Sequence, residues 1–265
     1  MRMVLGYIVS SICCLGFFWS TAVKADNVNS ESPLSGVRES YPRLLVDQTT
    51  WDALRESHDR GDALGRLVAW LEAEATGMLE APPLTREMEG IRLLATSRRA
   101  MYRLTTLALT YRTSGDARFL ARAVQELESV LSFDDWTPAH FLDTAEMAVG
   151  VALAYDWLHD DLSLELRSKV REALISRVLR EVTAEEPAGY MWWMTSPINW
   201  NSVCFAAVTV SALAVADQEP QLAAEAIAVV LSLNPRDMIV YVPDGVDAEV
   251  SSFWNYGTTF QVLLI

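Results

Sequence analysis

Cysteine and histidine are both scarce in this chain of 265 residues, which contains three of each. Two of the cysteines, Cys13 and Cys14, lie in the first 25 residues, a segment that we expect to be removed. Cys204 then has no partner in the chain, so no internal disulfide can form and stability must come from a packed core. No cluster of His, Cys and Asp has the spacing of metal ligands, so we predict no metal and no other cofactor.

Basic residues are also few, since 21 Lys and Arg stand against 35 Asp and Glu and the formal net charge is −14. The first 25 residues hold Arg2 and Lys24 and no acid, so their removal takes the charge from −14 to −16. Nucleic acids and anionic membranes are bound by an excess of Lys and Arg, and this balance excludes a general attraction to either. An anionic small or linear ligand, held by a local basic cluster, stays open.

The amino-terminal segment Met1–Ala25 has the three parts of a secretory signal peptide. Arg2 supplies the positive region, Val4 to Phe18 the apolar region, and Val23-Lys24-Ala25 a cleavage site with small residues. The alternative, a retained membrane anchor, is disfavoured because the apolar run is short and a cleavage site follows it. We therefore expect an exported protein, periplasmic or secreted, with no stable membrane insertion after cleavage. Residues 26–43 are polar with Ser, Pro and Gly and are expected to form a flexible lead-in.

Long runs of alternating apolar and polar residues are missing as well, so we expect almost no β-sheet. Helical periodicity dominates instead, in segments of two kinds. Phe141–Leu158 and Val203–Ala216 are apolar nearly all round, which is typical of buried helices. The segments Phe119–Leu131, Leu162–Val182 and Gln221–Leu233 each carry a single apolar stripe, which is typical of helices covering a core on one side.

The alternation of buried and striped helices predicts two concentric layers, and hence an all-α fold, an (α/α) toroid of helical hairpins over residues 44–265. A helical-repeat solenoid is the structural rival, but the sequence has no fixed period to support it. The chain ends inside the apolar run Phe260–Ile265, so we expect the toroid to be truncated at its carboxyl end.

Two polar stretches interrupt the apolar helices and predict a cleft. Asn199-Trp200-Asn201 follows Pro197, which we expect to impose a loop, and a second cluster one hairpin later contains Glu249, Trp254 and Tyr256. Amide groups, flat aromatic faces and a phenol suit an oxygen-rich ligand such as a sugar. The alternative for the first stretch is a set of helix caps around a core tryptophan.

Three further residues are candidate ligand-binding groups. His140 stands at the mouth of the buried segment 141–158, where it is either a ligand or proton-transfer group or a capping histidine. Glu146, one turn further on, is either a buried acid that binds sugar hydroxyls or the structural partner of an arginine. Arg99 belongs to a group with Arg98 and Arg103 whose charge could assist a nearby phenol, although a solvated helix face is the commoner use of such residues.

Several ordered motifs from about Tyr41 to the end of the chain resemble the amino-terminal domain of polysaccharide lyases of the heparinase II/III type. These motifs are Ser97-Arg98-Arg99, Tyr111-Arg112-Thr113-Ser114-Gly115-Asp116, His140-Phe141-Leu142-Asp143-Thr144-Ala145-Glu146-Met147, Tyr155-Asp156-Trp157-Leu158, Asn199-Trp200-Asn201-Ser202-Val203-Cys204 and Tyr241-Val242-Pro243-Asp244-Gly245. The resemblance implies an (α/α) toroid followed by a β-sandwich, which we expect to lie beyond Ile265.

The resemblance also implies cleavage of a uronic-acid polysaccharide, such as heparan, chondroitin or alginate, by β-elimination. Asn199 or Asn201 would neutralise the uronate carboxylate and so stabilise the enolate. A tyrosine or histidine would transfer the proton, and Tyr256 is the candidate. The polysaccharide would be contacted by seven residues, namely Trp200, Asn201, His140, Glu146, Glu249, Trp254 and Arg99.

Two departures from the family pattern keep other functions open. Phe253 stands where related lyases have a tyrosine, and Ile198 where an Asn or His is common, and neither side chain can replace the polar group. A non-catalytic carbohydrate-binding protein is therefore one alternative. A glycoside hydrolase on the same toroid is the other, and it would use Glu146 and Glu249 as opposed carboxylates.

Overall fold

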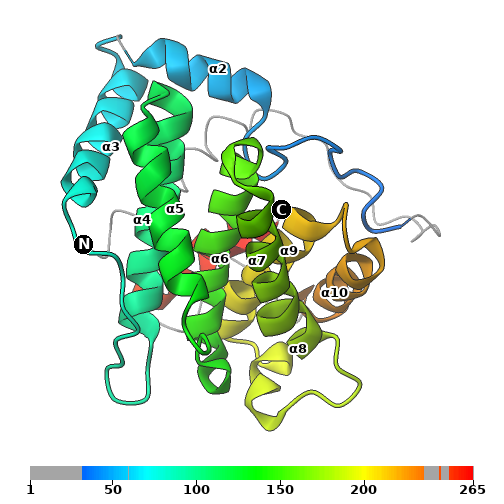
Figure 1. The fold of residues 1–265 in the computed structure, drawn as a ribbon. Coiled ribbons are helices and arrows are strands. Elements are labelled where there is room, and N and C mark those ends of the chain that lie inside the picture. Colours follow the sequence, from blue (N-terminus) through cyan, green and yellow to red (C-terminus); the bar gives the residue numbers. More distant parts are fainter. Residues whose placement is uncertain (1–31, 59, 236–244, 246–250, 265) are drawn as a thin grey trace.

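The computed structural model describes residues 32–58, 60–235, 245 and 251–264, and these form helices joined by short loops (Figure 1). No strand occurs in these ranges, which hold only an isolated β-bridge between Glu89 and Arg92. The expectation of an all-α chain with almost no sheet is confirmed for this part. The helices are α2 (Gln48–Ser57), α3 (Ala63–Leu79), α4 (Leu94–Ser114), α5 (Ala117–Leu131), α6 (Phe141–Leu158), α7 (Leu164–Leu174), α8 (Arg180–Val182), α9 (Asn199–Val215), α10 (Pro220–Leu233) and α12 (Ser251–Gln261).

Shorter helical turns connect several of these helices. A π-helical turn, Ile175–Leu179, joins α7 to α8 without a break, and the predicted helix 162–182 is therefore three consecutive pieces. The 3₁₀ turns are Pro138–His140, His159–Asp161, Gly189–Thr195 and Val262–Leu264.

Local capping chemistry explains where many helices begin and end. Asp116 accepts a hydrogen bond from the backbone N–H of Arg118 at the start of α5, and Gly115 ends α4 with a positive φ of 72°. Aspartate is favoured at the start of a helix and glycine just after its end, so the Gly-Asp pair separates the two helices. An Asp-Asp pair before a striped segment would also favour a helix start, but Asp160 and Asp161 belong to a 3₁₀ turn and Ser163 caps α7 at the N–H of Leu166.

The predicted distinction between buried and striped helices is confirmed. Every residue of α6 is buried, and α9 is buried except at two positions, Trp200 and Leu213. By contrast, α5 buries one face, which includes Phe119, Ala123 and Leu127. Helices α4, α6 and α9 are neighbours in that order, and α5 and α10 pack beside α4 and α9 respectively.

Helices α4, α6 and α9 run in the same direction. At their amino ends, Arg92 and Leu93 before α4 bind Asp143 on α6, and His140 before α6 packs on Trp200 of α9. At the carboxyl end of α4 the Tyr111 phenol donates to Asp161, just after α6. The amino ends of all three helices therefore meet on one side of the molecule.

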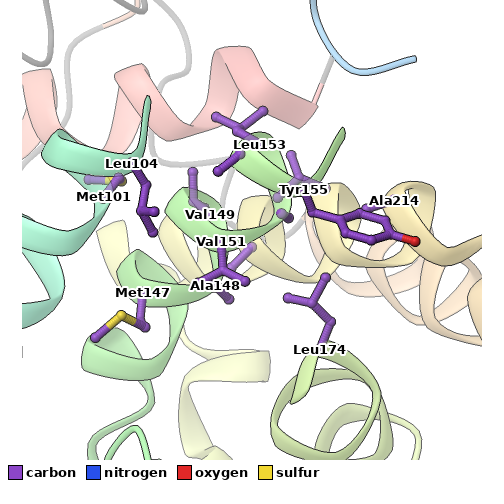
Figure 2. Packing of buried hydrophobic residues seen from close by; sticks show 14 of the residues in the cluster. Met101, Leu104, Met147, Ala148, Val149, Val151, Leu153, Tyr155, Leu174 and Ala214 are labelled. Atoms are coloured by element: carbon purple, nitrogen blue, oxygen red, sulfur yellow. The ribbon is translucent and has the colours of Figure 1, made fainter. Parts of the chain in front are cut away.

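The core is formed where α4, α6, α7 and α9 meet. Figure 2 shows Met101 and Leu104 of α4 beside several α6 side chains, with Leu174 of α7 and Ala214 of α9 closing the group. Gly150 of α6 allows the closest approach, since a Cβ atom there would lie 2.5 Å from the Met101 Cα. Small side chains and this glycine let the inner helices approach each other closely.

The end of the expected lead-in is fixed to the carboxyl end of α6. The backbone N–H groups of Arg43 and Leu44 donate to the buried Asp156 carboxylate at 2.9 to 3.0 Å. Tyr41 stacks on His159 and donates to the Ala214 carbonyl, next to the end of α9. The expected signal segment, Met1–Ala25, lies outside the described residues.

Candidate functional site

The stretch Asn199-Trp200-Asn201 forms the first turn of α9 and not the predicted loop. Pro197 lies two residues before this helix, so the loop that it favours ends earlier than expected. The stretch therefore faces the amino ends of α4 and α6, where the chain also brings together His140, Glu146 and the phenol of Tyr256.

Glu146 is the centre of a buried polar cluster formed by three helices. Its carboxylate has no exposed surface and accepts hydrogen bonds at 3.0 Å from the Nε of Arg98 on α4, one to each oxygen. The Tyr256 phenol on α12 donates to the same carboxylate. Figure 1 shows α12, in red, behind α6. Helices α4, α6 and α12 are thus joined by one carboxylate, and the sequence interpretation of Glu146 as the partner of an arginine agrees with this contact.

The Arg98 side chain links this buried cluster to solvent. It keeps 37% of its surface exposed, although its Nε is bonded to a carboxylate that is almost fully covered. Its guanidinium carbon also lies 5.2 Å from the centre of the Tyr256 ring, within the range of a cation–π contact. A soluble anion could therefore reach a cation that already contacts both Glu146 and Tyr256.

Burial controls the protonation of this cluster. It raises the pKa of Glu146 to about 7, although Arg98 and the hydrogen bond from Tyr256 act in the opposite direction. Burial and the adjacent Glu146 carboxylate also raise the pKa of Tyr256 well above its usual value, and Arg98 only partly opposes them. Arg98 therefore acts on the Tyr256 phenol in the predicted direction but is outweighed, so Tyr256 keeps its proton and donates a hydrogen bond to Glu146.

A second group of side chains lies one turn earlier on α6. The buried Asp143 carboxylate accepts hydrogen bonds from Arg92 and from the Leu93 N–H, and the His140 Nδ1 lies 3.6 Å from it. Burial and the charge of Arg92 lower the pKa of His140, so its ring is mainly neutral near pH 7. His140 makes no side-chain cap of α6, and its ring packs on Trp200 instead.

Aromatic rings continue from His140 to the protein surface. The ring centres of His140 and Trp200 are 4.6 Å apart, and those of Trp200 and Trp192 are 5.0 Å apart. Trp192 is 50% exposed, whereas the next residue, Trp193, is completely buried. We call His140, Trp200 and Trp192 the aromatic platform.

The two asparagines of the first turn have different surroundings. Asn201 is fully buried, and its amide donates to the carbonyls of Trp193 and Met194 at 3.3 and 3.1 Å while its oxygen accepts from Asn234. These contacts occupy the side chain with protein groups. Asn199, the first residue of α9, is 5% exposed and is also engaged in the protein.

The remaining predicted residues are not part of the Glu146 cluster. Arg99 pairs with Glu87 at 2.8 Å on the surface. Trp254 is partly exposed and donates from its indole N–H to the Gly245 carbonyl, and Phe253 beside it is also exposed. Glu249 lies outside the described residues, so its predicted role as a second carboxylate has no structural description.

Two residues of this region were missing from the predicted site, namely Arg98 and Trp192. Arg98 was noticed only as one of three arginines, and its distance of 48 positions from Glu146 gives no local sequence signal. Trp192 belongs to a consecutive pair of tryptophans in the 3₁₀ turn Gly189–Thr195, where successive side chains point in different directions and only one of the two rings faces the core.

Within the described ranges no group of three or more His, Cys, Asp and Glu side chains is suited to hold a metal ion. In the same ranges no single helix is long and apolar enough to cross a membrane, while the pair Gly189–Thr195 and Asn199–Val215, bent by 98°, meets the criterion of length and composition together.

Comparison with models of known protein families and with curated proteins found no match to this chain.

Proposed function

We propose that this protein is an exported polysaccharide lyase that cleaves a uronic-acid polymer by β-elimination. The observation that carries the proposal is the phenol of Tyr256 held by a buried glutamate and a partly exposed arginine, on the same side of the molecule as the aromatic platform. Elimination needs a proton-transfer group, a charge that favours a carboxylate, and a surface for sugar rings. This region contains all three types of group.

The platform supports binding of a carbohydrate chain. Trp192 offers an exposed indole face, and sugar rings present C–H groups that pack well on such faces. The amino ends of α6 and α9 add partial positive charge, which favours the anionic groups of a uronate polymer despite the acidic overall charge. Arg98 adds a full positive charge that is accessible to solvent.

The chemistry follows from the weak acidity of the substrate. The proton on the carbon beside a uronate carboxylate becomes acidic only when that carboxylate is neutralised, because the electron pair then spreads into it as an enolate. Arg98 is the strongest candidate for this neutralisation, and Asn199 at the start of α9 is the second. Tyr256 would take the proton from this carbon and give a proton to the leaving glycosidic oxygen.

We also infer that the two layers of helices are part of an (α/α) toroid. The parallel inner helices α4, α6 and α9 and their outer partners support this arrangement, which is the fold implied by the family resemblance. Export rests on the sequence of the first 25 residues alone.

Ultraviolet absorbance tests the activity, because elimination leaves a conjugated, unsaturated uronate at the new chain end. We expect the protein to generate this absorbance on one polymer from a panel of heparan, chondroitin and alginate. Tyr256→Phe should lower the rate about 10²- to 10⁴-fold while polymer binding is retained, since only one hydroxyl is lost. Tyr102→Phe, which removes a phenol that donates to Glu74 outside this region, is the matched control. A wild-type rate in Tyr256→Phe would remove Tyr256 from the mechanism.

A non-catalytic carbohydrate-binding protein is the second candidate, and the exposed Phe253 favours it. Where related lyases have a tyrosine, this chain has a hydrocarbon ring that cannot transfer a proton. Polymer binding without any absorbance change would support this candidate. A rate gained in Phe253→Tyr would show that the missing phenol belongs at that position.

A further inference from the structure

The direction of the hydrogen bond between Tyr256 and Glu146 limits how Tyr256 can act. The phenol donates to the carboxylate, so its oxygen already carries a proton. Burial and the glutamate both hold that proton in place at neutral pH. A phenol in this state cannot accept a second proton unless the first one leaves at the same time.

We propose that Glu146 takes the phenol proton of Tyr256 while Tyr256 takes the proton from the substrate carbon, an inference that rests on the proposed lyase activity. The C–H bond breaks, its electron pair stays on the substrate as the enolate, and a new O–H bond forms on Tyr256. The old O–H bond breaks and its proton forms an O–H bond with Glu146. The enolate then expels the glycosidic oxygen, which receives a proton from Tyr256 as Glu146 returns its own. All groups are thereby restored, and no other reactant is needed.

The groups around Glu146 suit a temporary proton acceptor. Arg98 on α4 stabilises the charged carboxylate, while Asp143, one turn earlier on α6, stabilises the neutral acid. The buried Cys204 thiol on α9 also faces this region and stays protonated, because burial and the two carboxylates raise its pKa. With a pKa of about 7, Glu146 is close to balance between its two forms at neutral pH. An acceptor of this kind can both take and return a proton.

A second tyrosine–glutamate hydrogen bond in this protein lies outside the candidate site and serves for comparison. The Tyr102 phenol on α4 donates to Glu74 on α3 at 2.5 Å. Glu74 is half-buried, and the contact described for its carboxylate is the one with the Tyr102 phenol. Glu146 differs because it is completely buried and bound by Arg98. In this role Glu146 is a positioning residue, since it acts on the substrate only through Tyr256.

The kinetic test compares the purified wild-type protein with Glu146→Gln and Glu74→Gln. Glutamine keeps the shape of glutamate but cannot take a proton. In Glu146→Gln we expect kcat to fall about 10²- to 10⁴-fold with KM unchanged. The wild type should lose activity below about pH 7, because a protonated Glu146 cannot take the phenol proton, and the residual rate of Glu146→Gln should lack this pH dependence. Glu74→Gln should keep both the rate and the pH profile. A Glu146→Gln variant with the wild-type pH profile would overturn the inference.

Infrared titration supplies a second measurement, which needs no turnover and can be made on the wild-type protein even if Glu146→Gln does not fold. The carbonyl band of a neutral carboxyl group should disappear with a midpoint near pH 7 in the wild type, and that midpoint should move in Tyr256→Phe. A band that titrates near pH 4.5, the usual range of a glutamate, would overturn the inference even in an active lyase. A wild type that cleaves no uronate polymer overturns the proposed function and the reaction step with it, while the titration separately decides whether the two residues share a proton.

Discussion

The close contact between α4 and α6 predicts opposite effects for two substitutions of glycine by alanine. At Gly150 a Cβ atom would lie 2.5 Å from the Met101 Cα and 3.1 Å from its N, both backbone atoms that cannot rotate away. The two helices would have to separate by about 1 Å to restore normal contact, and such overpacking typically costs about 1 to 3 kcal/mol. We expect Gly150→Ala to lower the free energy of unfolding by this amount.

Gly77 on α3 is the matched control, because it lies in a helix with no atom within 4 Å of the added Cβ. Alanine there should stabilise the protein by about 0.5 to 1 kcal/mol through helix propensity alone. The two variants should therefore differ by about 1.5 to 4 kcal/mol in urea-induced unfolding followed by circular dichroism. Equal stability of the two variants would refute the close approach of α4 and α6.

Two further predictions concern the opposite end of the inner helices and the aromatic platform. Burial raises the pKa of Asp156 to about 6, above its unfolded value, so folding favours the neutral form of this side chain. Its contribution to the free energy of unfolding, roughly 3 kcal/mol, is therefore full below about pH 4 and lost by about pH 6. Asp156→Asn should remove this change from the pH dependence of urea unfolding. If the wild type and Asp156→Asn have the same dependence of stability on pH over this range, the raised pKa of Asp156 is wrong. Trp192→Ala should weaken polymer binding about tenfold, on the order of 1.4 kcal/mol, without changing stability, and calorimetry showing unchanged affinity would exclude the platform as a binding surface.

The helices could be predicted because their signals are local. The segment 141–158 is apolar on every side, and a helix with that pattern has to be buried. Gly115 and Asp116 mark a helix end and a helix start by their own backbone and side-chain chemistry. The start of α9 was misplaced because Pro197 indicates a break in the chain but not how soon a helix resumes.

The composition of the candidate site could be predicted only in part, because its contacts join distant segments. Arg98 and Arg99 are consecutive, and successive helical residues point about 100° apart, so only one of them can face α6. The sequence does not determine which, and the structure has Arg98 on Glu146 and Arg99 on the exposed Glu87. The sequence also does not determine whether an asparagine binds a ligand or the protein itself. The Asn201 side chain forms hydrogen bonds with two buried backbone carbonyls and with the side chain of Asn234.

The most direct test of the proposed activity is mass spectrometry of the cleavage products formed in water enriched in heavy oxygen. A lyase breaks the glycosidic bond without adding water, so each new pair of chain ends should contain an unsaturated uronate and no heavy oxygen. A hydrolase adds one water to every bond that it cleaves, and its products would carry one heavy oxygen and no double bond. Heavy oxygen in the products, or an intact polymer after incubation with the wild-type protein, would contradict the assignment of β-elimination.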